Sequence, residues 1–174
     1  LYAEQDFDRA LDIVVDLEDI TTRMYGENHP VTASVVNNHA LLKRATGEYE
    51  AAVELFSSAI QKYEESVGKD HTSTATALHN LGLTYKSMYE SGTFTGVEEL
   101  QLQDRAEEAL RESMSRRSKE HVDRATTMYI LASVRGTQGK NEESVELFDD
   151  ALMILRSSYE QSKGSGQSGL RLAT

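Results

Sequence analysis

Three histidines are the first residues whose type and spacing suggest chemistry. Gly-x-x-His occurs at 26–29 and at 68–71, so His29 and His71 lie 42 positions apart, and His121 follows after a further 50. Imidazole binds metals well, but a metal site needs ligands that converge on one point. Histidines at equivalent places of successive repeats lie in a row instead. The sequence therefore favours turn packing and satisfaction of helix-end N–H groups, and it predicts no metal site and no cofactor.

The other chemistry-bearing residue types form no catalytic pattern. The chain has no Cys, which excludes disulfides, thiolate catalysis and Cys-ligated zinc. It has no phosphate-binding glycine loop, no nucleophile elbow and no pair of histidines at i, i+4 on one helix. Its many carboxylates fall at helical spacing, where solvated faces are expected. The sequence therefore predicts a protein that is not an enzyme.

Charge and hydropathy limit the classes of partner. Eighteen Lys and Arg against 29 Asp and Glu give a net charge of −11, which would repel a nucleic-acid backbone. No apolar run approaches the ~20 residues that a membrane span needs. The one basic cluster, residues 116–119, is expected at a helix end, where cations offset the helix dipole; a docking or kinase site is the alternative. The chain begins at Leu1 without a leader, so we expect a fragment, and its compartment is unknown with an intracellular one favoured.

The flanks of the two Gly-x-x-His motifs repeat as well. At an offset of 42, small residues align with small ones and large apolar residues with large apolar ones. The aligned pairs include Ala10 with Ala52, Val14 with Phe56, Ala33 with Ala75 and Asn38 with Asn80. A shift of 50 aligns the next copy, and 42 then returns. The eight extra residues lie between Leu81 and Ala109, where Gly92 and Gly96 indicate an extended turn.

Each repeat is expected to contain two helices. Apolar residues follow helical spacing over 31–46 and again over 49–67. Gly47 and Gly139 lie in short turns at helix ends, and Pro30 lies near a helix start, where its missing N–H costs nothing. No stretch shows the alternation of a half-buried strand. The chain is therefore predicted to be all-α.

The spacing within these helices resembles the tetratricopeptide repeat. Its signature is carried by Gly47, Tyr49, Ala52, Phe56 and Ala59, and again by Gly139, Phe148 and Ala151. The 42-residue length, and Gly-x-x-His-Pro before a helix with paired asparagines, resemble the repeats of kinesin light chains over about residues 1–160. This resemblance implies a right-handed superhelical α-solenoid of helix hairpins. The chain departs from the pattern at His39, where an apolar residue is usual, and in the insertion at 91–97.

The resemblance also divides the chain. We expect a partial first repeat over 1–30 that supplies a second helix, and three repeats over 31–72, 73–121 and 122–164, with the inserted loop near 91–97. Residues 165–174 are expected to start a further repeat, in which Ala173 and Thr174 align with Ala75 and Thr76. A linker over 165–174 is the alternative.

The family resemblance implies a concave groove, lined by the first helix of each repeat, that binds an extended peptide or a helix of a partner. Helix periodicity places on it Asn37, Asn38, Leu41, Arg44, His79, Asn80, Leu83, Lys86, Tyr129 and Ile130. The amides of Asn38 and Asn80 could pair with both halves of a peptide unit, although they could instead cap or cross-link the packed helices. Arg44 and Lys86 would attract carboxylates, and Tyr129 would be an aromatic anchor.

Two functions follow from these predictions. The first is a non-catalytic scaffold or adaptor that binds a partner protein in its groove. The alternative is a structural subunit of a larger assembly, with contacts through the convex face, the 91–97 loop and the solenoid ends. Ile130 interrupts the row of cations that would grip a terminal carboxylate, so a receptor for chaperone tails is not favoured.

Overall fold

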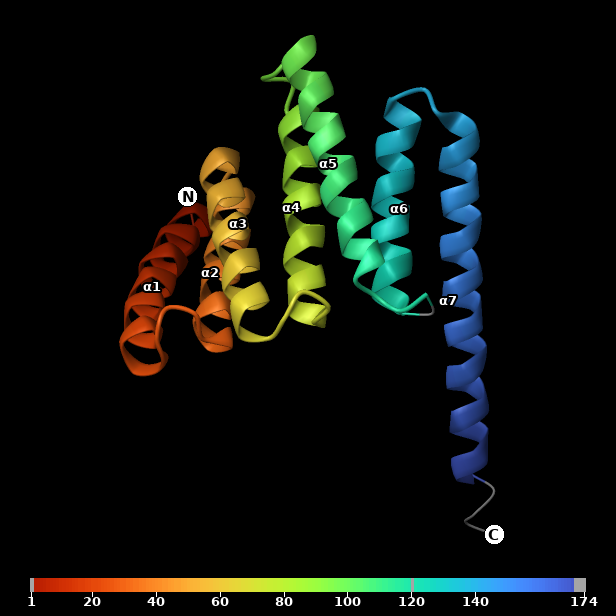
Figure 1. Cartoon of the computed structure of the whole chain (residues 1–174), viewed down its shortest axis with the longest axis horizontal. Helices are drawn as coiled ribbons and strands as arrows, with labels where there is room; N and C mark the ends of the chain where they lie inside the picture. Colours follow the sequence, from red (N-terminus) through yellow and green to blue (C-terminus); the bar gives the residue numbers. More distant parts are fainter. Residues whose placement is uncertain (1, 120, 171–174) are drawn as a thin grey trace. The chain divides into compact units, whose positions relative to one another are not determined.

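The computed structural model describes residues 2–119 and 121–170, and within them the chain forms seven helices and no strand (Figure 1). The helices are α1 (Tyr2–Tyr25), α2 (Pro30–Ala45), α3 (Tyr49–Ser66), α4 (Thr72–Glu90), α5 (Val97–Ser115), α6 (Val122–Thr137) and α7 (Asn141–Leu170). They form two compact units, Leu1–Arg116 with α1–α5 and Arg117–Thr174 with α6 and α7. The predicted all-α class is confirmed.

The first unit is built from helix hairpins packed side by side. The helices α2 and α3 form one hairpin and α4 and α5 another, while α1 packs on α2, α3 packs on α4, and α2 also touches α4. Small residues on the first helix of a hairpin pack against large residues on the second helix. Phe56 of α3 is fully buried against Ala40 of α2, with Leu81 of α4 beside it, and Tyr63 packs between Ala33 and Ala77.

The three periodic histidines cap helices. His29, His71 and His121 are the N-cap residues of α2, α4 and α6, each with an extended backbone. In each case the ring Nδ1 accepts a hydrogen bond at 3.2 Å from the backbone N–H two residues later. These N–H groups have no partner inside their own helices. The predicted structural role of the histidines is confirmed.

The glycines of the motif explain why it recurs as Gly-x-x-His. Gly26 and Gly68 have φ of 98° and 95°, a conformation that other residues adopt only at a cost. Each glycine carbonyl then accepts a hydrogen bond at 2.9 Å from a threonine hydroxyl six residues later, Thr32 or Thr74. The glycine, the histidine and the threonine together shape the turn between repeats and cap the start of the next helix.

Removal of one cap tests its contribution. The His71→Ala substitution is expected to lower the free energy of unfolding by about 1 kcal/mol, because the Ser73 N–H loses its acceptor. The His71→Asn substitution keeps an N-cap acceptor and should retain most of that stability. Urea unfolding followed by circular dichroism at 222 nm measures both. Equal losses in the two variants would show that His71 acts through something other than its cap.

Helices α4 and α5 approach closely at Gly82. A Cβ on this residue would lie 2.7 Å from Cγ of Leu110 and 3.1 Å from the carbonyl O of Ala106. A buried hydrogen bond at 2.7 Å, from the Ser113 hydroxyl to the carbonyl O of Ala75, lies in the same hairpin. Glycine is therefore required at this position for steric reasons, although its φ is ordinary.

Polar contacts tie the first unit together at its edges. His39 Nδ1 lies 3.2 Å from Oε2 of Glu18, a contact that joins α2 to α1. Arg116 follows the last residue of α5 and donates to Glu64 of α3 at 2.7 Å and to the carbonyl O of Lys69 at 3.3 Å. It also pairs with Glu112. The basic cluster therefore does begin at a helix end, as predicted.

The second unit is the hairpin of α6 and α7. Leu131, Ala132 and Val134 of α6 are fully buried, and the Ser144 hydroxyl of α7 donates to the carbonyl O of Ala132 at 2.8 Å. Arg117 Nη1 donates to Oγ1 of Thr127 at 2.9 Å, which fastens the start of the unit to α6. The bond from Ser144 to Ala132 joins the first turn of α7 to α6.

The ends of the helices bear on the predicted repeat bounds. The segment between α4 and α5 is 91–96, where Gly92 and Gly96 have positive φ. Helix α7 continues through 165–170, so the helix does not stop before the predicted further repeat. Ala173 and Thr174, on which that repeat was aligned, lie outside the described residues. Across the part of the chain that the structure covers, no helix combines the length and apolar character needed to cross a membrane.

Candidate functional site

The predicted groove residues fall on the first helix of each hairpin. Asn37, Asn38, Leu41 and Arg44 lie on α2, and His79, Asn80, Leu83 and Lys86 lie on α4. These two helices touch, so eight of the ten residues share one pair of neighbouring helices within the first unit. Tyr129 and Ile130 lie on α6, in the second unit.

The asparagine side chains of this surface have amide groups that are open to hydrogen bonding. Asn38 is exposed and Asn80 is half-buried, and neither side-chain amide hydrogen-bonds to any residue that the structure describes. The side-chain oxygen of Asn37 is buried and also has no partner within that same part of the chain. The contacts thus give no sign that Asn38 and Asn80 cap or cross-link helices, the structural alternative for these residues.

The two cations of the surface differ in their availability. Arg44 is half-buried and its Nη1 has no hydrogen-bond partner among the described residues. Burial lowers the pKa of the Arg44 guanidinium, an effect that Tyr49 partly opposes. Lys86 instead forms an ion pair with Glu90, one turn further along α4, so its charge is already compensated. Arg44 is therefore the better candidate for an anionic ligand group.

Tyr129 and Ile130 have different surroundings in the second unit. Tyr129 is 59% exposed, and its ring lies 5.6 Å from the ring of Phe148 on α7 in a tilted arrangement. Ile130 is half-buried. The aromatic surface that was predicted on α6 alone is thus shared between α6 and α7.

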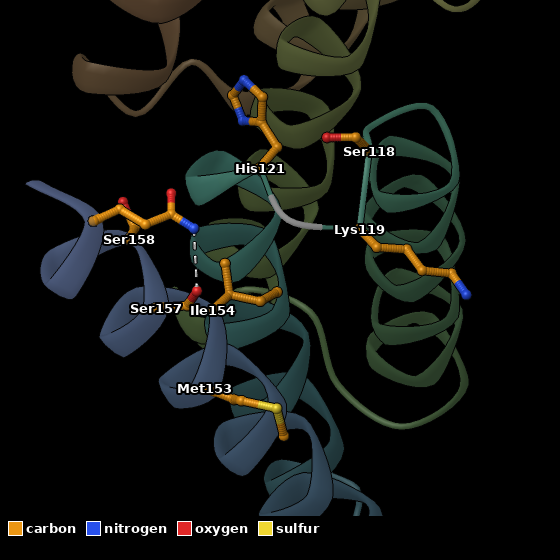
Figure 2. A pocket seen from close by; sticks show the side chains of 8 residues that line it. Ser118, Lys119, His121, Met153, Ile154, Ser157 and Ser158 are labelled. Carbon is orange, nitrogen blue, oxygen red and sulfur yellow. Dashed lines mark hydrogen bonds between the residues drawn. The ribbon is translucent and has the colours of Figure 1, made fainter.

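A pocket of about 560 Å³ lies in the second unit, between α7 and the segment before α6 (Figure 2). Its lining includes Ser118, Lys119, His121, Met153, Ile154 and Ser157. In Figure 2 the Lys119 side chain extends away from α7, so the pocket does not combine this cation with the serines of α7. The geometry assigns it no ligand.

Comparison with the first hairpin explains the pocket, which sequence reasoning missed. There, Glu27 and Asn28 of the turn bind Lys62 at 3.2 Å and Glu65 at 2.5 Å on α3. The repeat offsets align Lys62 with Ile154 and Glu65 with Ser157, so neither charged partner remains on α7. The loss of both charges was the signal in the sequence.

A metal site does not arise from the described residues. No group of three or more His, Asp or Glu side chains in 2–119 and 121–170 is arranged to hold an ion. The candidate site is a surface of amides, the half-buried guanidinium of Arg44, the paired Lys86 and apolar side chains.

Helix hairpins that recur after 42 and then 50 residues, packed through alanine and aromatic positions, define an α-helical repeat protein of the solenoid class. Residues 32–90 match the model of the family described as tetratricopeptide repeat. Residues 32–90 thus carry tetratricopeptide repeats. This fold supports a protein-interaction scaffold in general terms.

Solved structures share this fold at low sequence identity. BtubC (BKLC) from P. vanneervenii is 19% identical with a TM-score of 0.76, and the match covers 89% of this chain and 59% of that one. The MamA RS-1 ArsTM double mutant is 13% identical with a TM-score of 0.60, over 91% of this chain and 71% of that one. MamA is 17% identical with a TM-score of 0.58, over 91% and 94%. The chain thus spans less than two thirds of the length of BtubC, and a search of curated proteins finds no match.

Proposed function

We propose that α2 and α4 form the binding surface of a non-catalytic scaffold that holds an extended segment of a partner protein. The observation that carries this proposal is the pair of side-chain amides, Asn38 and Asn80, which have no partner among the described residues and occupy equivalent repeat positions. An amide that both donates and accepts can replace the hydrogen bonds that one backbone unit of an extended chain makes with water. Such binding depends little on the ligand's side chains.

The spacing of the two helices suits this ligand. The axes of packed helices lie about 8–10 Å apart, and α2 and α4 touch at only a few positions, so their axes are at least about that far apart. An extended chain rises about 3.3 Å per residue, so the two amides would reach backbone units about three or more residues apart. Leu41 and Leu83 each lie three residues after an asparagine, on the same helix face, and are half-buried. They would contact apolar side chains of the bound segment.

Selectivity would come from Arg44. Its half-buried guanidinium has one nitrogen, Nη1, without a partner among the described residues, and a carboxylate of the ligand would satisfy that nitrogen if the side chain turned toward it. Lys86 contributes less because Glu90 already holds it. We therefore expect the preferred segment to carry apolar side chains and an acidic residue near Arg44.

A second role, as a subunit of a larger assembly, is supported by a separate observation. Large apolar side chains are exposed on α1 and on α7, outside the α2 and α4 surface. They are suited to fixed interfaces between subunits. The two roles use different surfaces, so variants of α2 and α4 distinguish them.

The test removes both amides and keeps the fold. Wild-type chain, an Asn38→Ala/Asn80→Ala variant and a Gln101→Ala control, which removes an exposed amide on α5, would be matched for helicity by circular dichroism. Each would select from a library of extended peptides and capture proteins from native extract for mass spectrometry. The dissociation constant for a selected peptide would then be measured by calorimetry.

The double variant is expected to bind the selected peptide about tenfold more weakly or worse, because each lost hydrogen bond contributes about 0.5–1.5 kcal/mol. The Gln101→Ala control should bind like the wild type. If all three proteins select the same peptides and capture the same partners with equal affinity, the groove proposal is wrong and the assembly role is favoured.

A further inference from the structure

Helix α7 exposes a regular apolar stripe. Val145, Phe148, Leu152, Leu155 and Tyr159 follow one another at spacings of three and four residues, and each is 39–58% exposed. Residues at these spacings lie on one face of a helix, as in the seam of a coiled coil. An unbroken stripe of five large side chains is costly to leave in water, because each would gain from burial.

The first unit shows how the same face behaves when it has a neighbour. The repeat offsets align Phe148, Leu152 and Leu155 with Phe56, Ile60 and Tyr63 of α3, and Tyr159 with Val67, which directly follows α3. Those four aligned residues are buried or half-buried, and Ala77 and Leu81 of α4 pack in the same clusters. The stripe on α7 is therefore the repeat's own packing face, and within residues 2–119 and 121–170 no helix covers it as α4 covers α3.

Charges beside the stripe indicate what covers it. Glu142, Asp149, Arg156 and Lys163 lie seven residues apart along one edge of the stripe, in the order acid, acid, base, base. None of them forms an ion pair with another residue in the described part of the chain. Lys163 lies over the Tyr159 ring at 4.8 Å, which keeps its charge next to the stripe.

This order is self-complementary only when two copies run in opposite directions. An antiparallel pair centred near Leu152 and Leu155 places Asp149 opposite Arg156 of the second copy, and Glu142 opposite its Lys163. A parallel pair would instead place this charged edge opposite the other edge of the stripe, which carries the uncharged residues Ser144, Ala151 and Ser158. Opposite charges along the edges of a helix seam set partner choice and direction. The order of charges along the stripe thus favours a second copy of α7 as the partner helix.

We propose that two copies of this chain associate through an antiparallel pairing of their α7 helices. The exposed apolar side chains of α1 are a poorer alternative partner. Ile13, Leu17 and Ile20 of that helix are flanked by Asp12, Asp16 and Asp19, which would repel the acidic half of α7. The pairing uses a surface separate from Asn38 and Asn80, so it is independent of the proposed ligand groove.

Charge variants test both the partner and the direction. Arg156→Glu/Lys163→Glu makes the edge entirely acidic, and Glu142→Lys/Asp149→Arg makes it entirely basic. Sedimentation velocity of the 174-residue chain at about 10–100 μM would give the oligomeric state, with helicity checked for each variant. We expect a wild-type dimer, at least about tenfold weaker self-association in each variant, and restored association when the two variants are mixed.

A cysteine probe locates the contact, since the chain has no native cysteine. The Leu152→Cys variant is expected to form a disulfide-linked dimer under mild oxidation, because Leu152 lies near the two-fold axis. The Asp150→Cys control points away from the stripe and should stay monomeric on a reducing-agent-free gel. A wild-type chain that is monomeric at 100 μM, or a dimer that survives in the all-acidic variant, would overturn the proposal. Capture of a different helical protein by the stripe, without self-association, would overturn it as well.

Discussion

The Phe56→Ala substitution is expected to lower the free energy of unfolding of the first unit by about 3–5 kcal/mol. Phe56 is fully buried between Ala40 and Ala52, with Leu41, Leu55 and Leu81 packed around it. Small residues in close-packed helices cannot collapse into the space left by a benzyl group, so the cavity cost adds to the lost burial. Such a loss is a large part of the stability of a small unit.

Phe148→Ala is the matched control, because the repeat offsets place Phe148 at the same position as Phe56. Phe148 is 39% exposed, so its removal should cost less than half as much. Urea unfolding at 222 nm gives the totals, and hydrogen exchange read by mass spectrometry assigns each loss to peptides of α3 or α7. Equal costs for the two substitutions would contradict the difference in burial.

Gly82→Ala is expected to destabilise the chain by up to about 2 kcal/mol, although alanine is normally the better helix former. The gain in helix propensity is about 1 kcal/mol, whereas crowding a packed interface costs about 1–3 kcal/mol. The new Cβ would lie 2.7 Å from Leu110 Cγ and 3.1 Å from a backbone oxygen, so α4 and α5 must separate. Thermal and urea unfolding would measure the change.

Two further variants identify the cause of the Gly82→Ala effect. Gly136→Ala, in the last turn of α6, meets nothing closer than the Ser144 hydroxyl at 3.5 Å and should be neutral or slightly stabilising. In a Leu110→Ala background the Gly82→Ala change should lose most of its cost, since the clashing atom is gone. A loss that persists unchanged in that background would rule out the clash as its cause.

The sequence was sufficient to predict the helices and the turns between them, because these depend on the chemistry of neighbouring residues in the chain. Helices predicted over 31–46 and 49–67 are observed at Pro30–Ala45 and Tyr49–Ser66. Gly47 and Gly139 have the positive φ expected at helix ends, and Pro30 is the first residue of its helix. A turn that requires a positive φ is recognised from a single Gly, and a helix start that tolerates a missing N–H is recognised from a single Pro.

The candidate site was less accessible to sequence reasoning, because it depends on neighbours. Periodicity placed Arg44 and Lys86 at equivalent positions, yet one is half-buried with an unsatisfied nitrogen and the other is paired with Glu90. The apolar stripe of α7 had the same pattern as the core face of α3. A periodic pattern identifies the face of a helix that prefers burial, but the helix that covers it belongs to another part of the fold.

Arg116 and Arg117 are consecutive, yet they belong to different units. The guanidinium of Arg116 is held by Glu64 and the carbonyl O of Lys69, and that of Arg117 by Thr127. A protease that cleaves after arginine must draw that side chain out into its own pocket. Here the Arg116 side chain is 10% exposed and Arg117 is 8% exposed, and each guanidinium is already bound, so the folded chain offers neither arginine to trypsin.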